Sequence, residues 1–349
     1  MLSEKQRLRL ALRRGEVDRP PCICPGGMMN MVTHGVMQAA NVFWPAAHTD
    51  PGLMAALSAA AHDTGCFENY GVPFCMTVEV ENMGAKVDLG DAVHEPRVSG
   101  YVIESVSDWK RLPPMDCARG RAAVVLEAIR LLKARGSGVP ITGNLTGPVS
   151  TASSLMEPTV FYKELRKKKQ DAHDFMDFVS EQLLAFGLEQ LKAGADVITI
   201  SDPSGTGEIL GPALFAEYAV PALNKITRGL RGAFPDAGLI VHICGQMRSV
   251  FKPLAGVDCQ ALSFDAEVSL REAKKNLPGK AIMGNVSTFA LEFAEPDKIA
   301  AMTKLCVENG ADIVSPACGM GTGSPLPNVQ AILETLKTAV PIPIKAEAV

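Results

Sequence analysis

The sequence lacks a strong net charge and lacks long hydrophobic runs. Its 349 residues include 34 basic and 38 acidic side chains, which give a formal charge of −4. A mildly acidic chain has no positive field that would gather nucleic acid, so we expect no nucleic-acid partner. The apolar stretches stop well short of the ~20 residues that a membrane helix needs, and no signal peptide is visible. We therefore expect no membrane partner and predict a cytoplasmic protein.

The sequence also lacks the pattern of a disulfide framework. Nine cysteines are an odd number, and in a cytoplasmic chain they are expected to be reduced. Cys22 and Cys24 have apolar neighbours that favour a place in the core, although Cys24 and Cys75 could still line a pocket. We interpret four others as packing residues: Cys66, Cys117, Cys259 and Cys306.

A dinucleotide-binding fingerprint is missing too, because no G-x-G-x-x-G follows the first predicted strand. Instead, eight short apolar runs alternate with helical patterns, which predicts a parallel α/β sheet closed into a TIM (β/α)8 barrel. The predicted strands are Pro21–Cys24, Cys66–Tyr70, Ile141–Leu145, Val197–Ser201, Leu239–Cys244, Ala261–Phe264, Ala281–Gly284 and Ile313–Ser315. The predicted helical segments include Val160–Ala193, Ala213–Gly232, Met247–Leu254, Leu270–Asn276, Pro296–Asn309 and Asn328–Thr338.

Two segments do not follow this alternation of strands and helices. Residues 1–20 predict an N-terminal helix, and residues 74–110 predict a small β-rich excursion that serves as a hairpin or lid. Within that excursion the expected strands are Thr77–Glu81, Lys86–Leu89 and Gly100–Ser105. We find no linker, so residues 1–349 are interpreted as a single barrel domain.

Polar and metal-binding residue types gather where the predicted strands end. In a parallel barrel the active site lies at these ends and in the loops that follow them. Four of these residues are expected to bind substrate: Cys24, Asn144, Asp202 and Asn285.

The most specific of these strand-end patterns is His242-Ile243-Cys244. Residues two apart in a strand point to the same face, so this imidazole and thiolate can reach one ion. Cys318 lies 74 residues after Cys244, at the end of the last predicted strand, and can converge on it in a closed barrel. Two thiolates and one imidazole suit zinc, and three protein ligands would leave a fourth position for substrate. Buried rim residues that bind no metal are the alternative interpretation.

With these motifs in view, the chain resembles the uroporphyrinogen decarboxylase superfamily over nearly its whole length. Within it, the chain is most similar to the corrinoid-dependent methyltransferases of the methylcobamide:coenzyme M type. The decarboxylases themselves carry arginines near the first strand, whereas residues 23–29 here contain none. The resemblance is carried by Val72–Glu79, Gly143–Pro148, Asp202-Pro203, Val241–Gly245, Gly284–Val286 and Pro316–Gly319.

The resemblance implies a zinc-bearing barrel in which His242, Cys244 and Cys318 are both the metal ligands and the catalytic residues. It further implies Asp265 as a loose fourth ligand, with Glu267 as the next candidate, and adds Glu79 to the substrate-binding residues. It implies a separate corrinoid-binding protein that carries the cobalamin, and a small-molecule methyl donor or acceptor.

Methyl transfer from the corrinoid to a thiol is the first hypothesis for the function. A zinc-bound thiolate can attack the methyl group of methyl-cobalt(III), and the reverse direction would load the corrinoid from a methoxylated or methylated substrate. A metal-free decarboxylase of the same superfamily and a module that only binds the corrinoid protein are the rivals. A homo-oligomeric state is left open.

Overall fold

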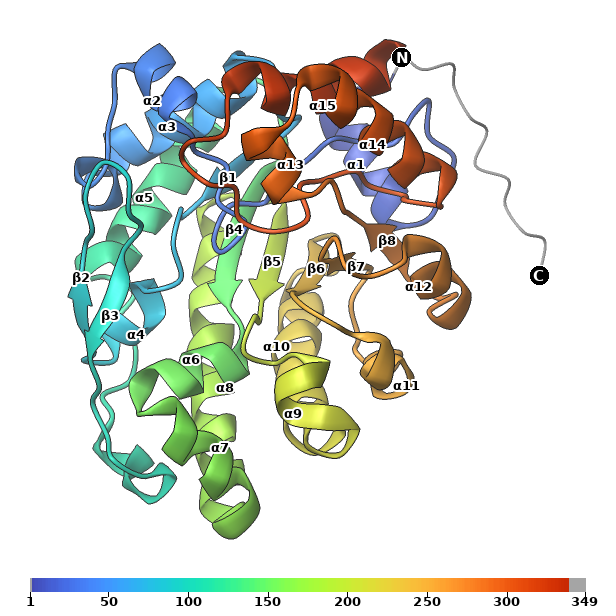
Figure 1. Cartoon of the computed structure of the whole chain (residues 1–349). Coiled ribbons are helices and arrows are strands. Elements are labelled where there is room, and N and C mark those ends of the chain that lie inside the picture. The colour runs from blue at the N-terminus through green and yellow to red at the C-terminus, as the bar shows by residue number, and fades with distance from the viewer. Residues whose placement is uncertain (1, 339–349) are drawn as a thin grey trace.

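Runs of aliphatic and β-branched residues form a parallel sheet at the centre of the molecule. The computed structural model describes residues 2–338, and six of its strands pair in parallel in the order β1-β4-β5-β6-β7-β8 (Figure 1). The side chains of these strands are buried, as expected for a parallel sheet covered on both faces. The six strands are β1 (Tyr70–Val72), β4 (Ile141–Thr146), β5 (Val197–Ser201), β6 (Gly238–Ile243), β7 (Ala261–Phe264) and β8 (Ala281–Met283).

Two further extended segments close the sheet into a barrel. Residues 313–316 pair in parallel with the β8 side through Met283↔Ile313 and Val286↔Pro316. Their other edge pairs with residues 21–24 through Cys22↔Val314. The Glu68 amide then donates to the Cys22 carbonyl at 2.8 Å, just before β1 begins. The predicted eight-stranded barrel is therefore confirmed, and two of its members are held by isolated bridges instead of continuous ladders.

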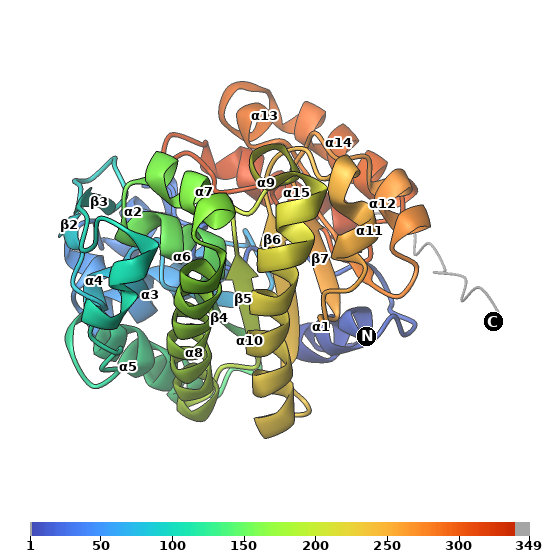
Figure 2. The same ribbon diagram turned by 90° about the horizontal axis from the view of Figure 1, so that it is seen from below.

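Helices cover the outside of this barrel, and Figure 2 shows α8 and α10 lying against the β4–β6 side. The predicted segment 160–193 is two helices, because Lys168 leaves the helical conformation (φ −124°, ψ 56°). The α-helices are α1 (Glu4–Leu12), α2 (His34–Ala40), α3 (Pro51–Asp63), α4 (Val78–Asn82), α5 (Gly120–Ala134), α6 (Pro148–Leu155), α7 (Pro158–Lys167), α8 (Lys169–Ala193), α9 (Gly207–Leu214), α10 (Val220–Ala233), α11 (Phe251–Leu254), α12 (Leu270–Asn276), α13 (Thr288–Phe293), α14 (Pro296–Glu308) and α15 (Leu326–Thr338). Short helical turns are η1 (Ala46–His48), η2 (Val106–Arg111), η3 (Phe215–Ala219) and η4 (Arg248–Val250). None of the described helices has both the length and the hydropathy that crossing a bilayer requires.

The N-terminal helix is shorter than predicted. A capping box from Ser3 and Gln6 starts α1 at Glu4, and such a box satisfies amide groups that the helix itself leaves unpaired. The helix ends at Leu12, and Arg14 follows with a left-handed φ of 57°. Residues 13–19 therefore connect α1 to the first extended segment instead of continuing the helix to residue 20.

The excursion contains one antiparallel hairpin, made of β2 (Lys86–Asp88) and β3 (Arg97–Gly100). The predicted strand Thr77–Glu81 is wrong, because Val78–Asn82 form α4. The alternation of valine and glutamate suggests a strand, but Glu79 is 1 % exposed and its carboxylate accepts a hydrogen bond from the Thr146 amide at 2.7 Å. This buried contact with β4 is information that local alternation does not carry. The third predicted strand is also wrong, because β3 stops at Gly100.

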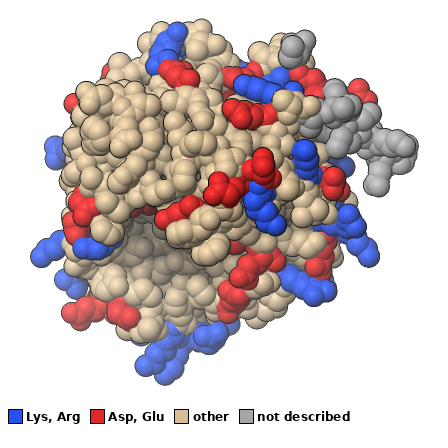
Figure 3. Space-filling model, turned by 45° about the horizontal axis from the view of Figure 1, so that its top comes forward, with Lys and Arg blue, Asp and Glu red and all other residues tan. Residues whose placement is uncertain are grey.

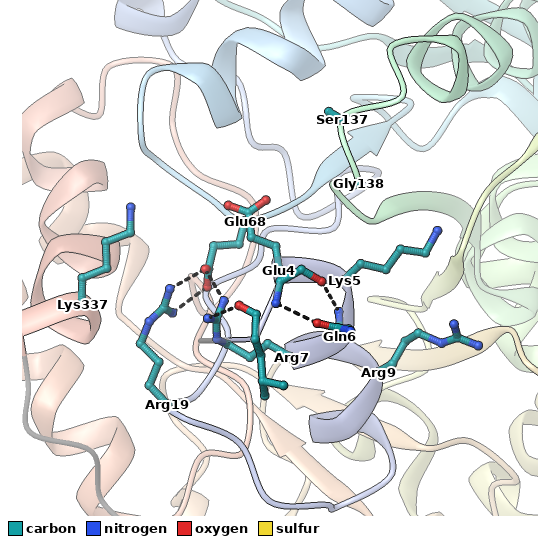
Figure 4. Close-up of a pocket in the computed structure, with 12 residues that line it drawn as sticks. Glu4, Lys5, Gln6, Arg7, Arg9, Arg19, Glu68, Ser137, Gly138 and Lys337 are labelled. Carbon is teal, nitrogen blue, oxygen red and sulfur yellow. Dashed lines mark hydrogen bonds and ion pairs between the residues drawn. The ribbon is translucent and has the colours of Figure 1, made fainter.

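An ion-pair network lies at the opposite end of the barrel, where the strands begin. Glu68 is 1 % exposed and accepts from Arg7 at 2.9 Å and from Arg19. The hydrogen bond from Arg7 lowers the pKa of Asp18 to about 2. Arg7, Arg19 and Glu68 line a cavity of about 550 Å³ (Figure 4). Glu68 is paired with Arg7 and Arg19, and the Glu4 carboxylate lies 3.0 Å from the His62 Nε2 atom, so these contacts join the N-terminal segment to the barrel.

Candidate metal centre

Three side chains converge at the end of the barrel where the strands finish. His242, Cys244 and Cys318 each place one possible ligand atom within 4.8 Å of the other two. The His242 Nε2 atom lies 3.1 Å from the Cys244 Sγ atom, which lies 3.1 Å from the Cys318 Sγ atom. These are the three residues that the sequence predicts as metal ligands. The sulfur–sulfur distance is well beyond the ~2.05 Å of a disulfide, so both thiols are free.

Strand geometry explains why these residues meet. His242 lies on β6, and Cys244 follows directly after the strand ends at Ile243. Cys318 follows the extended segment 313–316, which lies between the β8 side and residues 21–24 in the barrel wall. Only a closed barrel brings these two strand ends to one rim, because 74 residues separate the cysteines in the chain.

The neighbouring strand fixes the orientation of His242. His242 and Ser263 are register partners on β6 and β7, and the His242 Nδ1 atom lies 2.9 Å from the Ser263 Oγ atom. This contact leaves Nε2 facing the two sulfurs. Metal-binding histidines in proteins are generally held in this way by a partner on the second ring nitrogen. His242 is fully buried, whereas both cysteines are partly exposed, so access is from the cysteine side.

The two thiols form a coupled pair. The hydrogen bond between them lowers the pKa of Cys318 and raises that of Cys244, because one proton between the sulfurs favours a single thiolate. Thiolates and a neutral imidazole are the donors that zinc prefers, and a tetrahedral site with three such donors keeps one position open. The donor set therefore fits a catalytic type of zinc site.

Asp265 lies beside this cluster but outside the group of three. One of its carboxylate oxygens accepts from the Gly245 amide at 3.3 Å, and its negative charge is among the causes of the raised pKa of Cys244. Glu267 is exposed and is bound by Gln246. Asp265 as the fourth ligand remains a prediction that the distances among His242, Cys244 and Cys318 do not test.

Two of the predicted substrate-binding residues hold the first loop of the barrel. Asn144 donates from Nδ2 to the Pro25 carbonyl at 2.8 Å and to the Val72 carbonyl at 3.0 Å. Its buried Oδ1 atom has no partner. Cys24 is fully buried and donates to the Met29 carbonyl at 3.0 Å, and burial raises the pKa of its thiol. Gly71 permits the close approach of this loop, because a Cβ atom there would lie 2.1 Å from the Pro25 carbonyl oxygen.

The other three predicted substrate-binding residues also have partners within the protein. Asp202 is buried and accepts from the Ser150 amide and hydroxyl at the start of α6, and Glu79 is held by Thr146. Burial raises the pKa of both carboxyls. Asn285 donates to the carbonyls of Asp265 and Val268. A contact with substrate remains a prediction for each of these three residues.

Sequence reasoning missed two neighbours of the cluster. Ser263 is an unremarkable serine in the sequence, and only the β6–β7 register places it opposite His242. Met28 lies with its sulfur 3.7 Å from the Cys244 sulfur. Its methionine-rich segment is visible in the sequence, but its distance to the metal ligands is not.

Comparison with known proteins identifies the family of this chain. The family model described as uroporphyrinogen decarboxylase (URO-D) matches residues 3–339. A methylcobamide:CoM methyltransferase of Methanosarcina barkeri is 32 % identical, over 94 % of this chain and 96 % of its own length. A methylcobamide:CoM methyltransferase of Methanosarcina acetivorans is 30 % identical, over 95 % and 97 %. The solved structure of a methyltransferase from Methanosarcina mazei superposes with a TM-score of 0.88 at 31 % identity, covering 97 % of this chain and 99 % of that one.

Proposed function

The chain belongs to the uroporphyrinogen decarboxylase family, and on that premise we propose that it is a zinc- and corrinoid-dependent methyltransferase. It moves a methyl group between a corrinoid carried by a partner protein and a small thiol. The observation that carries the proposal is the convergence of His242, Cys244 and Cys318 on one point. The names of the similar proteins, which are methylcobamide:CoM methyltransferases, agree with it.

The chain's own residues would prepare the thiol for reaction. His242, Cys244 and Cys318 would hold zinc, and Ser263 would keep the Nε2 atom of His242 turned toward it. When bound, zinc lowers the pKa of a coordinated thiol so that it reacts as a thiolate. The partly exposed side of the two cysteines gives the thiol a way in.

The transfer itself balances without a further reactant. The substrate thiolate attacks the methyl carbon, a carbon–sulfur bond forms and the carbon–cobalt bond breaks. The electron pair of that bond stays on the metal, so methyl-cobalt(III) becomes cobalt(I), and the thiol proton leaves to solvent. The residues that would hold zinc would serve equally in the loading direction.

A corrinoid protein would have to dock over this rim. Helix α13 follows the loop after β8, and its Phe289 and Phe293 are 73 % and 68 % exposed with ring centroids 4.9 Å apart. The loop that carries Cys318 packs against the same helix, because a Cβ atom at Gly321 would lie 2.4 Å from the Glu292 carboxylate. The exposed aromatic pair therefore lies on a helix that contacts the loop carrying Cys318.

The test is methyl transfer from free methylcobalamin to 2-mercaptoethanol, followed by the visible spectrum of the corrinoid under anaerobic conditions. We expect the zinc-loaded protein to produce the cobalt(I) spectrum together with the S-methylated thiol, and the Cys318→Ala variant to lose this activity by at least about a hundredfold. Cys117→Ala is the matched control, because Cys117 is also partly buried but lies outside the cluster. Equal activity of the Cys318→Ala variant and the wild type would overturn the proposed site.

A further inference from the structure

Two consecutive methionines of the first barrel loop reach the metal centre from different sides. The Met29 sulfur lies 3.8 Å from the Ser263 Oγ atom, and both residues are buried. The Met28 sulfur lies 3.7 Å from the Cys244 sulfur, and both of these residues are partly exposed. Met29 therefore packs on the inner side, next to the serine that holds His242. Met28 lies on the outer side, from which a substrate would enter.

The backbone of Met28 also lies against the loop that carries Cys318. A Cβ atom at Gly319 would lie 2.4 Å from the Met28 carbonyl oxygen, so a side chain at this position would force the two loops apart. Gly319 directly follows Cys318, whose sulfur lies 3.1 Å from the Cys244 sulfur. Met28 thus spans both cysteines, with its carbonyl beside one of them and its thioether beside the other.

The loop that carries these methionines, residues 25–33, is held by hydrogen bonds on both flanks. The Gly27 amide donates to the Pro73 carbonyl at 2.7 Å. Asn30 donates from Nδ2 to the Met320 carbonyl at 3.3 Å and accepts from the Met320 amide at 3.3 Å. Gly27 has a left-handed φ of 62°, which glycine adopts without strain. The backbone of the loop is therefore fixed over the cysteines, and only the flexible end of a methionine side chain can move.

The distance between Met28 and Cys244 has a steric consequence for a thiol bound to zinc. In a tetrahedral site with zinc–sulfur bonds of ~2.3 Å, the sulfurs of two ligands lie about 3.8 Å apart. A thiol in the open position would place its sulfur at nearly the same distance from the Cys244 sulfur as the Met28 sulfur, which lies at 3.7 Å. The carbon next to the substrate sulfur, and any branch on it, must then fit beside the Met28 thioether.

We propose that Met28 restricts this chain to primary thiols, in which the carbon that bears the sulfur is unbranched. The inference rests on the proposed transfer of a methyl group to a thiol. A branch on that carbon would have to displace the methionine side chain or lie against the two cysteines. One methyl group more or less in a fitted apolar pocket typically changes binding by about 10–200-fold.

The experiment measures thiol binding by the full chain with cobalt(II) in place of zinc and without any corrinoid. A thiolate bound to cobalt(II) gives an intense absorption band in the near ultraviolet, so titration yields a dissociation constant. The probes are ethanethiol, propane-2-thiol and 2-methylpropane-2-thiol, which add methyl groups one at a time to the carbon that bears the sulfur. Figure 3 shows a hollow in the molecular surface with mostly uncharged walls and acidic side chains gathered along its upper edge. The three probes carry no charge, so charged groups at the rim do not decide the order of their affinities.

We expect the wild type to bind ethanethiol more tightly than 2-methylpropane-2-thiol by about tenfold or more. Met28→Ala removes the thioether beside Cys244 and should reduce this ratio by about tenfold, whereas Met28→Leu keeps most of the side-chain volume and should retain it. Met302→Ala is the matched control and should also retain the ratio, because Met302 is partly exposed but lies on α14, outside the barrel wall. Comparing variants through this ratio cancels differences in the acidity of the thiols themselves.

The possible failures are distinguishable. A Met28→Ala variant with the wild-type ratio would overturn the role of Met28, and a wild type that binds all three thiols equally would overturn the preference for primary thiols. If ethanethiol left the cobalt absorption of the wild type unchanged, thiol binding at the centre would itself be contradicted, and the inference would fall with it.

Discussion

At the scale of single residues, the centre depends on a side chain that would not itself bind metal. The Ser263 hydroxyl lies 2.9 Å from His242 Nδ1 and is buried with it. An imidazole without this contact could rotate or change tautomer, and Nε2 would then no longer face the sulfurs. The positions of the ligands thus depend on a residue one strand away.

Ser263→Ala should weaken zinc binding without unfolding the barrel. Loss of a partner on the second ring nitrogen typically costs about 10–100-fold in metal affinity, and we expect a loss in that range here. Competition with a chelator of known zinc affinity measures it. Ser263→Thr keeps the hydroxyl and should retain more affinity than the alanine variant, so identical affinities of the two variants and the wild type would argue against this orientation.

At the scale of elements, α13 is the helix whose surface is hardest to explain by folding alone. Most large apolar side chains of the described chain are buried, but Phe289 and Phe293 on this one short helix are mostly exposed. The helix also contacts the loop that carries Cys318 through Glu292 and Gly321. A partner protein seated here would bury the aromatic pair and lie beside the cluster.

The Phe289→Ser, Phe293→Ser double variant should therefore raise KM for the methylated corrinoid protein by about tenfold, because buried aromatic residues often dominate the binding free energy at interfaces. The rate with free methylcobalamin should stay unchanged. Leu305→Ser is a matched control, since Leu305 is 53 % exposed on the neighbouring α14. An equal loss with free and protein-bound corrinoid would place the effect on the active site and refute a docking role.

Element-level features also mark what the sequence can and cannot predict. The strand containing His242 is recognisable because an apolar run ends in metal-binding residue types. The helix α4 is not recognisable in the sequence, because its alternation of valine and glutamate is typical of a strand. Only the buried contact between Glu79 and Thr146 explains why this segment is helical. Ser263 is likewise not recognisable from the sequence, because only the β6–β7 register places it opposite His242.

At the scale of the whole molecule, closure of the barrel is what turns three distant residues into one centre. Residues 313–316 and 21–24 complete the barrel through isolated bridges and backbone hydrogen bonds. The alternation of strands and helices predicts this closure, because eight rounds of it match the barrel architecture. The position of Cys318 beside Cys244 follows from that closure, which is why the three ligands are predictable although their distances are not.

The zinc content of the purified protein tests this account most directly, measured by elemental analysis after removal of loosely bound metal. The account predicts one zinc per chain in the wild type and in the Cys117→Ala control, and far less than one in the Cys318→Ala variant. Circular dichroism should show that the variant keeps the overall fold. A wild type that holds no zinc, or a Cys318→Ala variant that keeps it in full, would contradict the metal centre.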